Sequence, residues 1–341
     1  MHGGDIYNNK ITYDFSVNVN PYGPYESVLT AIKDTVSQVV AYPEYNVDSL
    51  RRKLSDVHGI NHENIIITNG ASEAICAVIS AINPRRGYVE MPAFYGYERT
   101  LKSRNIECLF FDRDDVQIDV SEEDSVYFIA SPSNPTGKLI SIDKIKAIYE
   151  TIKNSNSFLI LDECFLPLSD GYKDSMIEEI KKDPDFYEHL IILRSFTKTF
   201  AIPGVRLGYI ICTNKKLINS IRDILPEWNV SLFAINAGLA CLDEVNRIPD
   251  DYEKIASERD RLTASLEKIG IEVIKSESIY IVIKTDYDLY NLLLDKGILI
   301  RNCEDYRGLG RGYFRIAVKK KEDNEILLDA IKEIIWKPAD Y

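Results

Sequence analysis

Several short apolar runs in this sequence end in residues that could take part in chemistry. The run Leu190–Leu193 is followed by Ser195 and Lys198, and the run Phe158–Leu161 is followed by Asp162. Burial at a strand end would lower the pKa of a lysine amine and make it a candidate for Schiff-base formation. The alternatives are a solvated surface lysine and, for the aspartate, a helix cap or half of a structural ion pair.

Two further segments could bind an anion. The segment Asn69–Glu73 follows the apolar run Asn64–Thr68 and opens a stretch with helical spacing. Free backbone N–H groups and the helix dipole at such a point favour a phosphate, although a simple helix cap would explain the segment too. Arg206, eight residues after Lys198, could add a guanidinium to the same phosphate.

Asn134 and Phe94 complete a set that one cofactor requires. Asn134 lies in SPSNPTG and could be a turn former, while Phe94 and Tyr95 follow Pro92 and could be core aromatics. Pyridoxal phosphate needs a lysine for its aldehyde, a carboxylate for its ring nitrogen, a phosphate cup, a donor to its phenolic oxygen and a ring to stack on. All these residue types are present, so the sequence predicts a site for this cofactor.

These residues can meet only if the elements that carry them form one sheet. Apolar runs at 64–68, 125–130, 158–161, 190–193 and 205–212 are separated by helical stretches at 71–82 and 142–153. Runs that are apolar on both faces and alternate with helices predict an α/β fold with a mostly parallel sheet covered by helices. In such sheets, ligands bind outside the carboxyl ends of the strands.

The chain ends differ from this middle part. A charged amphipathic helix is expected at 253–266, strands at 272–274, 279–283 and 313–318, and a closing helix at 324–335. This pattern predicts a smaller α+β unit. The predicted division is a large cofactor domain at 38–228 and a small domain made of an N-terminal arm at 1–37 together with 229–341.

Composition excludes several classes of partner. The 341 residues include 41 Lys and Arg against 53 Asp and Glu, a net charge of -12, which argues against nucleic acid and anionic membranes as partners. No targeting segment and no uncharged apolar run of about 18 residues is visible. The six cysteines are widely scattered, which predicts reduced thiols, no metal site and a cytoplasmic protein.

Over nearly its whole length, the chain resembles the fold-type I pyridoxal-phosphate enzymes of the class I/II aminotransferase group. The motifs that carry the resemblance are TNGASEA, SPSNPTG, LDE and SFTKTFAIPGVRLGY. The resemblance implies pyridoxal 5'-phosphate as the cofactor and a homodimer as the assembly. Lys198 matches the lysine that binds the cofactor aldehyde, Asp162 the carboxylate that faces the pyridine nitrogen, Asn134 the donor to the phenolic oxygen and Phe94 the stacking ring.

The same resemblance implies the phosphate site. Ala71 and Ser72 match the backbone turn that binds the cofactor phosphate, and Ser195 and Arg206 match its side-chain ligands. Tyr42 matches a tyrosine that reaches the cofactor of the neighbouring subunit. The sequence departs from the family in one place, because Phe165 occupies a position that is tyrosine in many relatives. A second donor to the phenolic oxygen is therefore missing or comes from elsewhere.

Within the group, the chain most resembles threonine-phosphate decarboxylases of the cobalamin pathway, followed by histidinol-phosphate aminotransferases. The signs are the HGG start, DFSVNVNPYGP, PEWNVS and ILIRNCEDYRGLG. Arg315 then matches the arginine that holds the substrate α-carboxylate. Arg301 and His2 would bind the substrate phosphate, and Asn20 is also expected at the substrate. For His2 the alternative is a disordered terminus, and for Arg301 a surface ion pair.

Two other classes of function are weaker matches. A nicotinamide oxidoreductase would need G-x-G-x-x-G between a strand and a helix, whereas the glycine cluster Gly308–Gly312 precedes a predicted strand. A non-catalytic cofactor-binding regulator is a further alternative. The presence of the lysine and both candidate substrate arginines, without a visible DNA-binding appendage, favours an enzyme.

Overall fold

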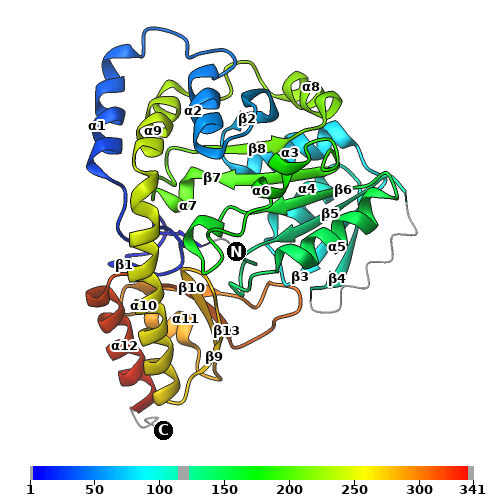
Figure 1. Cartoon of the computed structure of the whole chain (residues 1–341). Helices are drawn as coiled ribbons and strands as arrows, with labels where there is room; N and C mark the ends of the chain where they lie inside the picture. The colour runs from blue at the N-terminus through cyan, green and yellow to red at the C-terminus, as the bar shows by residue number, and fades with distance from the viewer. Residues whose placement is uncertain (1–2, 114–122, 337–341) are drawn as a thin grey trace.

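The computed structural model describes residues 3–113 and 123–336, and its centre is a seven-stranded sheet (Figure 1). The strand order is β2-β8-β7-β6-β5-β3-β4. β8 runs antiparallel to both β2 and β7, and the other neighbouring pairs that the registers describe are parallel. The strands are β2 (Ile65–Thr68), β3 (Arg86–Met91), β4 (Glu107–Asp112), β5 (Ser125–Ala130), β6 (Phe158–Asp162), β7 (Leu190–Ser195) and β8 (Gly208–Cys212).

Helices cover both faces of this sheet, as the apolar runs predict. Alternate side chains of β7 belong to different cores: Leu190 and Ile192 pack on one face, and Ile191 and Leu193 on the other. The first core includes residues of α2 (Asp48–His58), α5 (Ile142–Lys153) and α6 (Ile177–Lys182). The second includes residues of α3 (Ala71–Ile82), α4 (Gly96–Ser103) and α8 (Lys215–Ile224). The predicted fold class is therefore confirmed.

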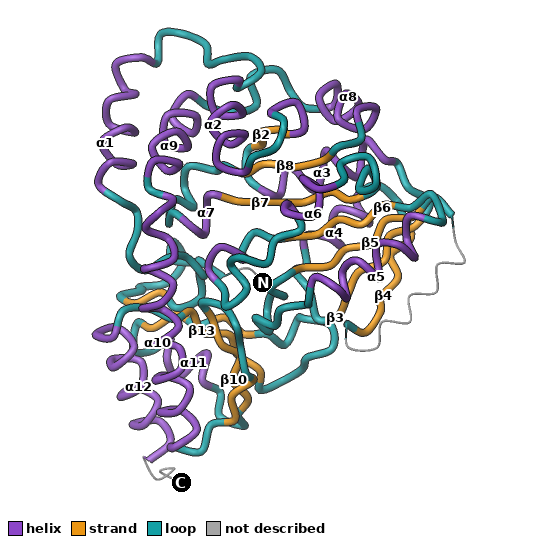
Figure 2. Tube along the Cα trace, in the orientation of Figure 1, coloured by secondary structure: helices purple, strands orange, loops and turns teal. Residues whose placement is uncertain are grey.

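The C-terminal part builds a four-stranded antiparallel sheet, ordered β12-β13-β10-β9, with helices beside it (Figure 2). Its strands are β9 (Glu272–Ile274), β10 (Tyr280–Lys284), β12 (Arg301–Asn302) and β13 (Tyr313–Ala317). Its helices are α10 (Ile248–Lys268), α11 (Leu289–Leu294) and α12 (Lys321–Trp336). No helix among residues 3–113 and 123–336 is long and apolar enough to span a bilayer.

The N-terminal arm touches both parts of the molecule. Its strand β1 (Tyr13–Asp14) pairs in parallel with β11 (Ile298–Leu299), next to the four-stranded sheet. Its helix α1 (Glu26–Thr35) packs against α9 (Leu232–Asp243), which in turn contacts α2 beside the large sheet (Figure 1). The arm thus links elements far apart in sequence, and the domain boundaries at 38 and 228 stay a prediction.

Two predicted elements begin elsewhere in the structure. The strand expected from Val205 begins only at Gly208, because Arg206 has a left-handed backbone with φ of 61° and belongs to a turn. The helix expected from Glu253 begins already at Ile248, where Pro249 occupies the first turn without breaking a hydrogen bond.

A buried ion pair links the residue that follows β4 to the carboxyl ends of β3 and β5. Arg113 donates through Nη1 to Glu90 Oε2 at 2.8 Å and to the carbonyl of Ala130 at 2.6 Å. The other oxygen of Glu90 accepts from the backbone N–H of Ala130 at 2.7 Å. Both charged side chains are almost fully buried, so removal of either would leave an uncompensated charge in the interior.

Replacement of Glu90 by alanine should therefore lower the free energy of unfolding by about 3–5 kcal/mol. Urea denaturation followed by circular dichroism measures this change. Glu107→Ala is the matched control, since Glu107 pairs with Arg86 at the surface and its loss should cost less than about 1 kcal/mol. Similar losses in both variants would contradict the structural role of the buried pair.

Candidate active site

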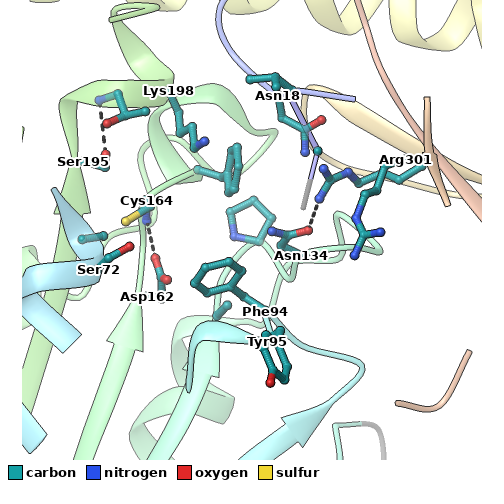
Figure 3. A pocket seen from close by; sticks show the side chains of 18 of the residues that line it. Asn18, Ser72, Phe94, Tyr95, Asn134, Asp162, Cys164, Ser195, Lys198 and Arg301 are labelled. Carbon is teal, nitrogen blue, oxygen red and sulfur yellow. Dashed lines mark hydrogen bonds between the residues drawn. The ribbon is translucent and has the colours of Figure 1, made fainter. Parts of the chain in front are cut away.

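A cavity of about 280 Å³ lies at the carboxyl ends of β5, β6 and β7, where the two sheets meet (Figure 3). It is lined from the large-sheet side by loops after the strands, and from the other side by β12, β13 and the N-terminal arm. Most residues predicted for the site line this one cavity. They are Ala71, Ser72, Phe94, Asn134, Asp162, Ser195, Lys198, Arg206, Arg301 and Arg315.

Lys198 lies on the short helix α7 (Phe196–Thr199), directly after β7. Ser195 caps this helix by accepting a hydrogen bond from the backbone N–H of Thr197 at 3.2 Å. Burial, followed by the positive charge of Arg315, lowers the pKa of Lys198 to about 8. A large fraction of this amine is therefore uncharged near pH 8, the form in which an amine is a nucleophile.

Asp162 ends β6, next to the lysine strand in the sheet. Its Oδ2 accepts from the hydroxyl of Tyr97 at 2.5 Å, and its Oδ1 accepts from the backbone N–H of Cys164 at 2.9 Å. Burial, followed by the charge of Asp162, raises the pKa of Tyr97 well above its ordinary value, so the hydroxyl remains a donor. Two donors thus hold a carboxylate at the cavity wall, where it could face a protonated ring nitrogen.

The turn before α3 has the shape of an anion cup. Gly70 has φ of 79° and ψ of 168°, a backbone conformation that other residues rarely adopt, so this turn requires glycine. Glu73 anchors the turn, since its Oε2 accepts from the backbone N–H of Asn69 and from the side chain of Asn229, both at 2.6 Å. The helix N-terminus, Ser72 and Arg206 together suit a phosphate.

Two arginines face the cavity from neighbouring strands. Arg301 on β12 lies opposite Arg315 on β13 in the strand register. Arg315 donates to the amide oxygen of Asn134 through Nη1 and to the carbonyl of Ser16 through Nη2 at 2.9 Å. The amide oxygen of Asn134 therefore already accepts a hydrogen bond. The amide nitrogen of the same side chain is left to donate one to a ligand. Figure 3 shows Asn134 between Arg301 and the lysine side of the cavity.

Asn20 requires a correction, because it does not line the cavity. Its buried side chain donates to the carbonyl of Thr199 at 3.2 Å and to Asp251 at 3.1 Å, and its backbone N–H donates to the carbonyl of Lys198 at 2.9 Å. Asn20 thus supports the lysine turn from behind. Asn18 lines the cavity instead, and both polar atoms of its side chain are buried without a partner among the residues that the structure describes.

Two other predicted residues lie elsewhere. Tyr42 is 79% exposed outside the cavity and packs on Trp228 at 4.7 Å between ring centres. His2 lies outside the described residues, although its neighbour Gly3 lines the cavity. Neither position tests the role that the resemblance implies.

The structure also adds residues that sequence reasoning missed. Tyr97, Cys164, Asp305 and Tyr306 all line the cavity. Tyr97 is three residues beyond the predicted stacking residue Phe94, and its ring packs on Phe94 edge-on at 5.6 Å. Its proximity to Asp162 links α4 to the end of β6, and no local sequence signal reveals a contact across 65 residues.

Comparison with known proteins identifies the family. The model of the aminotransferase class I and II family matches residues 10–331. The chain belongs to this family. It is 30% identical to the threonine-phosphate decarboxylase of Salmonella typhimurium, over 96% of this chain and 93% of the relative. A crystal structure of a histidinol-phosphate aminotransferase from Clostridium acetobutylicum is similar with a TM-score of 0.85 and 29% identity, over 95% of this chain and 99% of that one.

A third relative is longer than this chain. An adenosylcobalamin biosynthesis bifunctional protein of Leptospira interrogans is 28% identical over 98% of this chain, which spans only 41% of that protein. These findings confirm the resemblance noted in the sequence. The protein is a pyridoxal-phosphate-dependent enzyme of the decarboxylase and aminotransferase type.

The residues around the cavity fit this cofactor. A buried amine, a carboxylate held by two donors and an anion cup occur together at one sheet edge. Polar atoms of Asn18 and Nε of Arg315 are buried without a partner among the described residues, as expected where a polar ligand belongs. The cofactor would therefore be held by Lys198, Asp162 and the cup next to Ser72.

The depressed pKa of Lys198 can be measured on the cofactor-free protein. The rate at which an amine-reactive reagent labels Lys198, followed by mass spectrometry, should rise with pH as the amine loses its proton and be half-maximal near pH 8. An unperturbed lysine has a pKa of about 10.4.

The variant Arg315→Met should move the labelling midpoint of Lys198 to higher pH. Arg315 lowers this pKa by repelling the ammonium, so its removal favours the charged amine. A midpoint near 10 in the wild type, or no shift in the variant, would contradict the burial and charge environment described here.

Proposed function

We propose that this enzyme decarboxylates a phosphorylated amino acid, L-threonine phosphate or a close analogue such as L-serine phosphate. The observation that carries the proposal is the pair Arg301 and Arg315, which line the cavity of Lys198 from adjacent strands. A substrate with a carboxylate at one end and a phosphate at the other would use both guanidinium groups. The likeness to a threonine-phosphate decarboxylase supports the same substrate class.

The cofactor and the protein would have separate roles in this reaction. Bound pyridoxal phosphate supplies an electron sink for the pair of electrons released at the substrate α-carbon. Arg315 would hold the substrate carboxylate and Arg301 the phosphate, which orients the α-carbon between them. Asn18, with both side-chain polar atoms unpartnered among the described residues, would contact the substrate or the cofactor from the N-terminal arm.

Lys198 would control the proton that the reaction needs. Decarboxylation breaks the bond between the α-carbon and the carboxylate, and the carbon then takes up a proton. With a pKa of about 8, Nζ of Lys198 can both hold and release a proton near neutral pH. Burial of the amine keeps bulk water from competing for this step.

A histidinol-phosphate aminotransferase is the second candidate. The similarity to the Clostridium acetobutylicum enzyme, at 29% identity and a TM-score of 0.85, favours it about as strongly as sequence identity favours the decarboxylase. In that reaction the C–H bond breaks, Lys198 moves the proton, and 2-oxoglutarate accepts the amino group. A non-catalytic regulator is a remote alternative, which the complete set of polar groups in the cavity disfavours.

The reaction type can be tested with three substrates. Purified holoenzyme is incubated separately with L-threonine phosphate, L-serine phosphate and histidinol phosphate, each with and without 2-oxoglutarate. We expect carbon dioxide release from L-threonine phosphate or L-serine phosphate without a keto acid. Formation of glutamate alone would exclude the decarboxylase and support the aminotransferase.

The variant Lys198→Ala is the control for this assay. It should abolish turnover and the absorbance of the cofactor bound to the lysine, because Lys198 is the only lysine among the described residues that line the cavity. Turnover that persists in this variant would remove Lys198 from the mechanism.

We also propose that the enzyme is a homodimer with sites shared between subunits. Tyr42, Tyr45 and Trp228 form an aromatic patch, with Trp228 packed against both tyrosines at 4.7 and 5.6 Å between ring centres. Val40, two residues before Tyr42 in the sequence, is 94% exposed. The patch adjoins the phosphate cup, since Asn229 follows Trp228 and binds the same helix turn. A second copy on this surface could bring its Tyr42 to the exposed side of the cup.

Mixed dimers test this sharing. Lys198→Ala should be inactive, and Tyr42→Ala should be impaired through weaker cofactor binding. After the two variants are unfolded and refolded together, about a quarter of the wild-type activity should appear, because one site in each mixed dimer keeps both residues.

Two measurements control the mixed-dimer experiment. Sedimentation should give twice the 38.9 kDa mass of the chain. Tyr7→Ala, which removes a tyrosine that is 92% exposed and outside the aromatic patch, should leave activity unchanged. A monomer, or no activity above that of the separate variants, would overturn the shared site.

A further inference from the structure

The two arginines of the cavity differ in how their charges are balanced. Nη2 of Arg301 donates to both carboxylate oxygens of Asp305, at 2.7 and 3.0 Å, and Nη1 donates to the carbonyl of Asn302 at 2.5 Å. Arg315 donates only to uncharged oxygens, those of Asn134, Ser16 and Tyr306, as far as the described residues show. Arg315 therefore offers its positive charge to a ligand, whereas Arg301 is already paired with the carboxylate of Asp305.

The carboxylate of Asp305 is held at Arg301 by the loop that carries it. Arg307, two residues later, forms two hydrogen bonds with Glu98 on α4, at 2.8 and 3.2 Å. The backbone N–H of Tyr306 donates to the carbonyl of Cys303 at 3.0 Å and closes a turn around Asp305. Because both ends of this short loop are fixed, the carboxylate has a high effective concentration at Arg301.

An incoming anion must compete with this internal carboxylate. A monocarboxylate would replace one carboxylate by another, with no gain in charge and with a loss of translational and rotational freedom. A phosphate monoester carries nearly two negative charges above its second pKa of about 6 and has a further acceptor oxygen. A phosphate therefore gains more from Arg301 than a carboxylate does when it competes with Asp305, whose side chain is 44% exposed.

We propose that Asp305 is a specificity-determining residue that restricts the Arg301 end of the cavity to dianions. The inference rests on the proposed function and deepens it, because it names the chemical class accepted at this end. It also bears on the reaction type. An aminotransferase must bind the distal carboxylate of glutamate or 2-oxoglutarate in turn, and Asp305 disfavours such a ligand. A decarboxylase has no second substrate of this kind.

Two unreactive ligands of matched length isolate the effect. The phosphate monoester of 3-hydroxypropionate and glutarate each place an anionic group the same number of atoms from a carboxylate, but the first ends in a dianion at pH 8 and the second in a monoanion. Their dissociation constants on the purified holoenzyme are measured by calorimetry at pH 8. Neither ligand has an amino group, so the result does not depend on which reaction the enzyme performs.

We expect the wild type to prefer the phosphate ligand, and Asp305→Asn to reduce this preference by about tenfold, mainly by tighter binding of glutarate. Asp305→Ser should act in the same direction and guards against an effect specific to asparagine. Glu304→Gln is the matched control, because it removes the same charge from the adjacent exposed residue, which does not line the cavity. Its preference should equal that of the wild type.

Three outcomes would overturn the role of Asp305. They are an unchanged preference in both Asp305 variants, an equal change in Glu304→Gln, and a wild type that binds glutarate as tightly as the phosphate ligand. The melting temperature and the cofactor absorbance of each variant verify that it is folded and loaded. If carbon dioxide release fails while the preference changes as expected, the decarboxylase is excluded and the selectivity of Asp305 stands.

Discussion

The buried amine of Lys198 is the constraint on which the rest of the structure depends. An ammonium without water is costly, and burial together with Arg315 brings the pKa of this group to about 8. Lys198 has this environment because it follows β7, whose side chains pack into the cores on both faces of the sheet. Asn20 then holds the turn from behind through the carbonyl of Lys198. The reactivity of one side chain therefore depends on packing over the whole sheet.

The parallel pairing of β6 and β7 also explains why the carboxylate of Asp162 and the amine of Lys198 line the same cavity. Asp162 and Lys198 follow adjacent strands, and the register places Asp162 beside Leu193. Two hydrogen-bond donors stabilise the carboxylate of Asp162, whereas burial destabilises the ammonium form of Lys198. A cofactor with a positive ring nitrogen and an aldehyde fits between two such groups. The protein as a whole is acidic, with a net charge of -12, yet the cavity concentrates guanidinium groups.

Much of this arrangement could be predicted from the sequence, because periodicity and motif order report on elements and strand ends. The helix at 142–153 and the grouping of Lys198 with Asp162 at one cavity follow from such local signals. Contacts between distant segments could not be predicted this way. Asn18 and Asn20 share one motif, and only the path of the arm decides that Asn18 faces the cavity while Asn20 faces Asp251. The turn at Arg206 similarly depends on a left-handed backbone that no apolar pattern reveals.

Arg301 and Arg315 differ in charge balance, so the two ends of the cavity attract different anionic groups. A guanidinium that contacts only neutral oxygens, as far as the described residues show, attracts any carboxylate, so the proposed function assigns the α-carboxylate of the substrate to Arg315. Arg301 is already paired with Asp305, so on the same proposal the other end of the ligand brings more charge than a carboxylate does. An amino-acid phosphate therefore gains most in one orientation, which places its α-carbon consistently relative to Lys198. Specificity for the ligand and orientation for the chemistry thus follow from the same asymmetry between neighbouring strands.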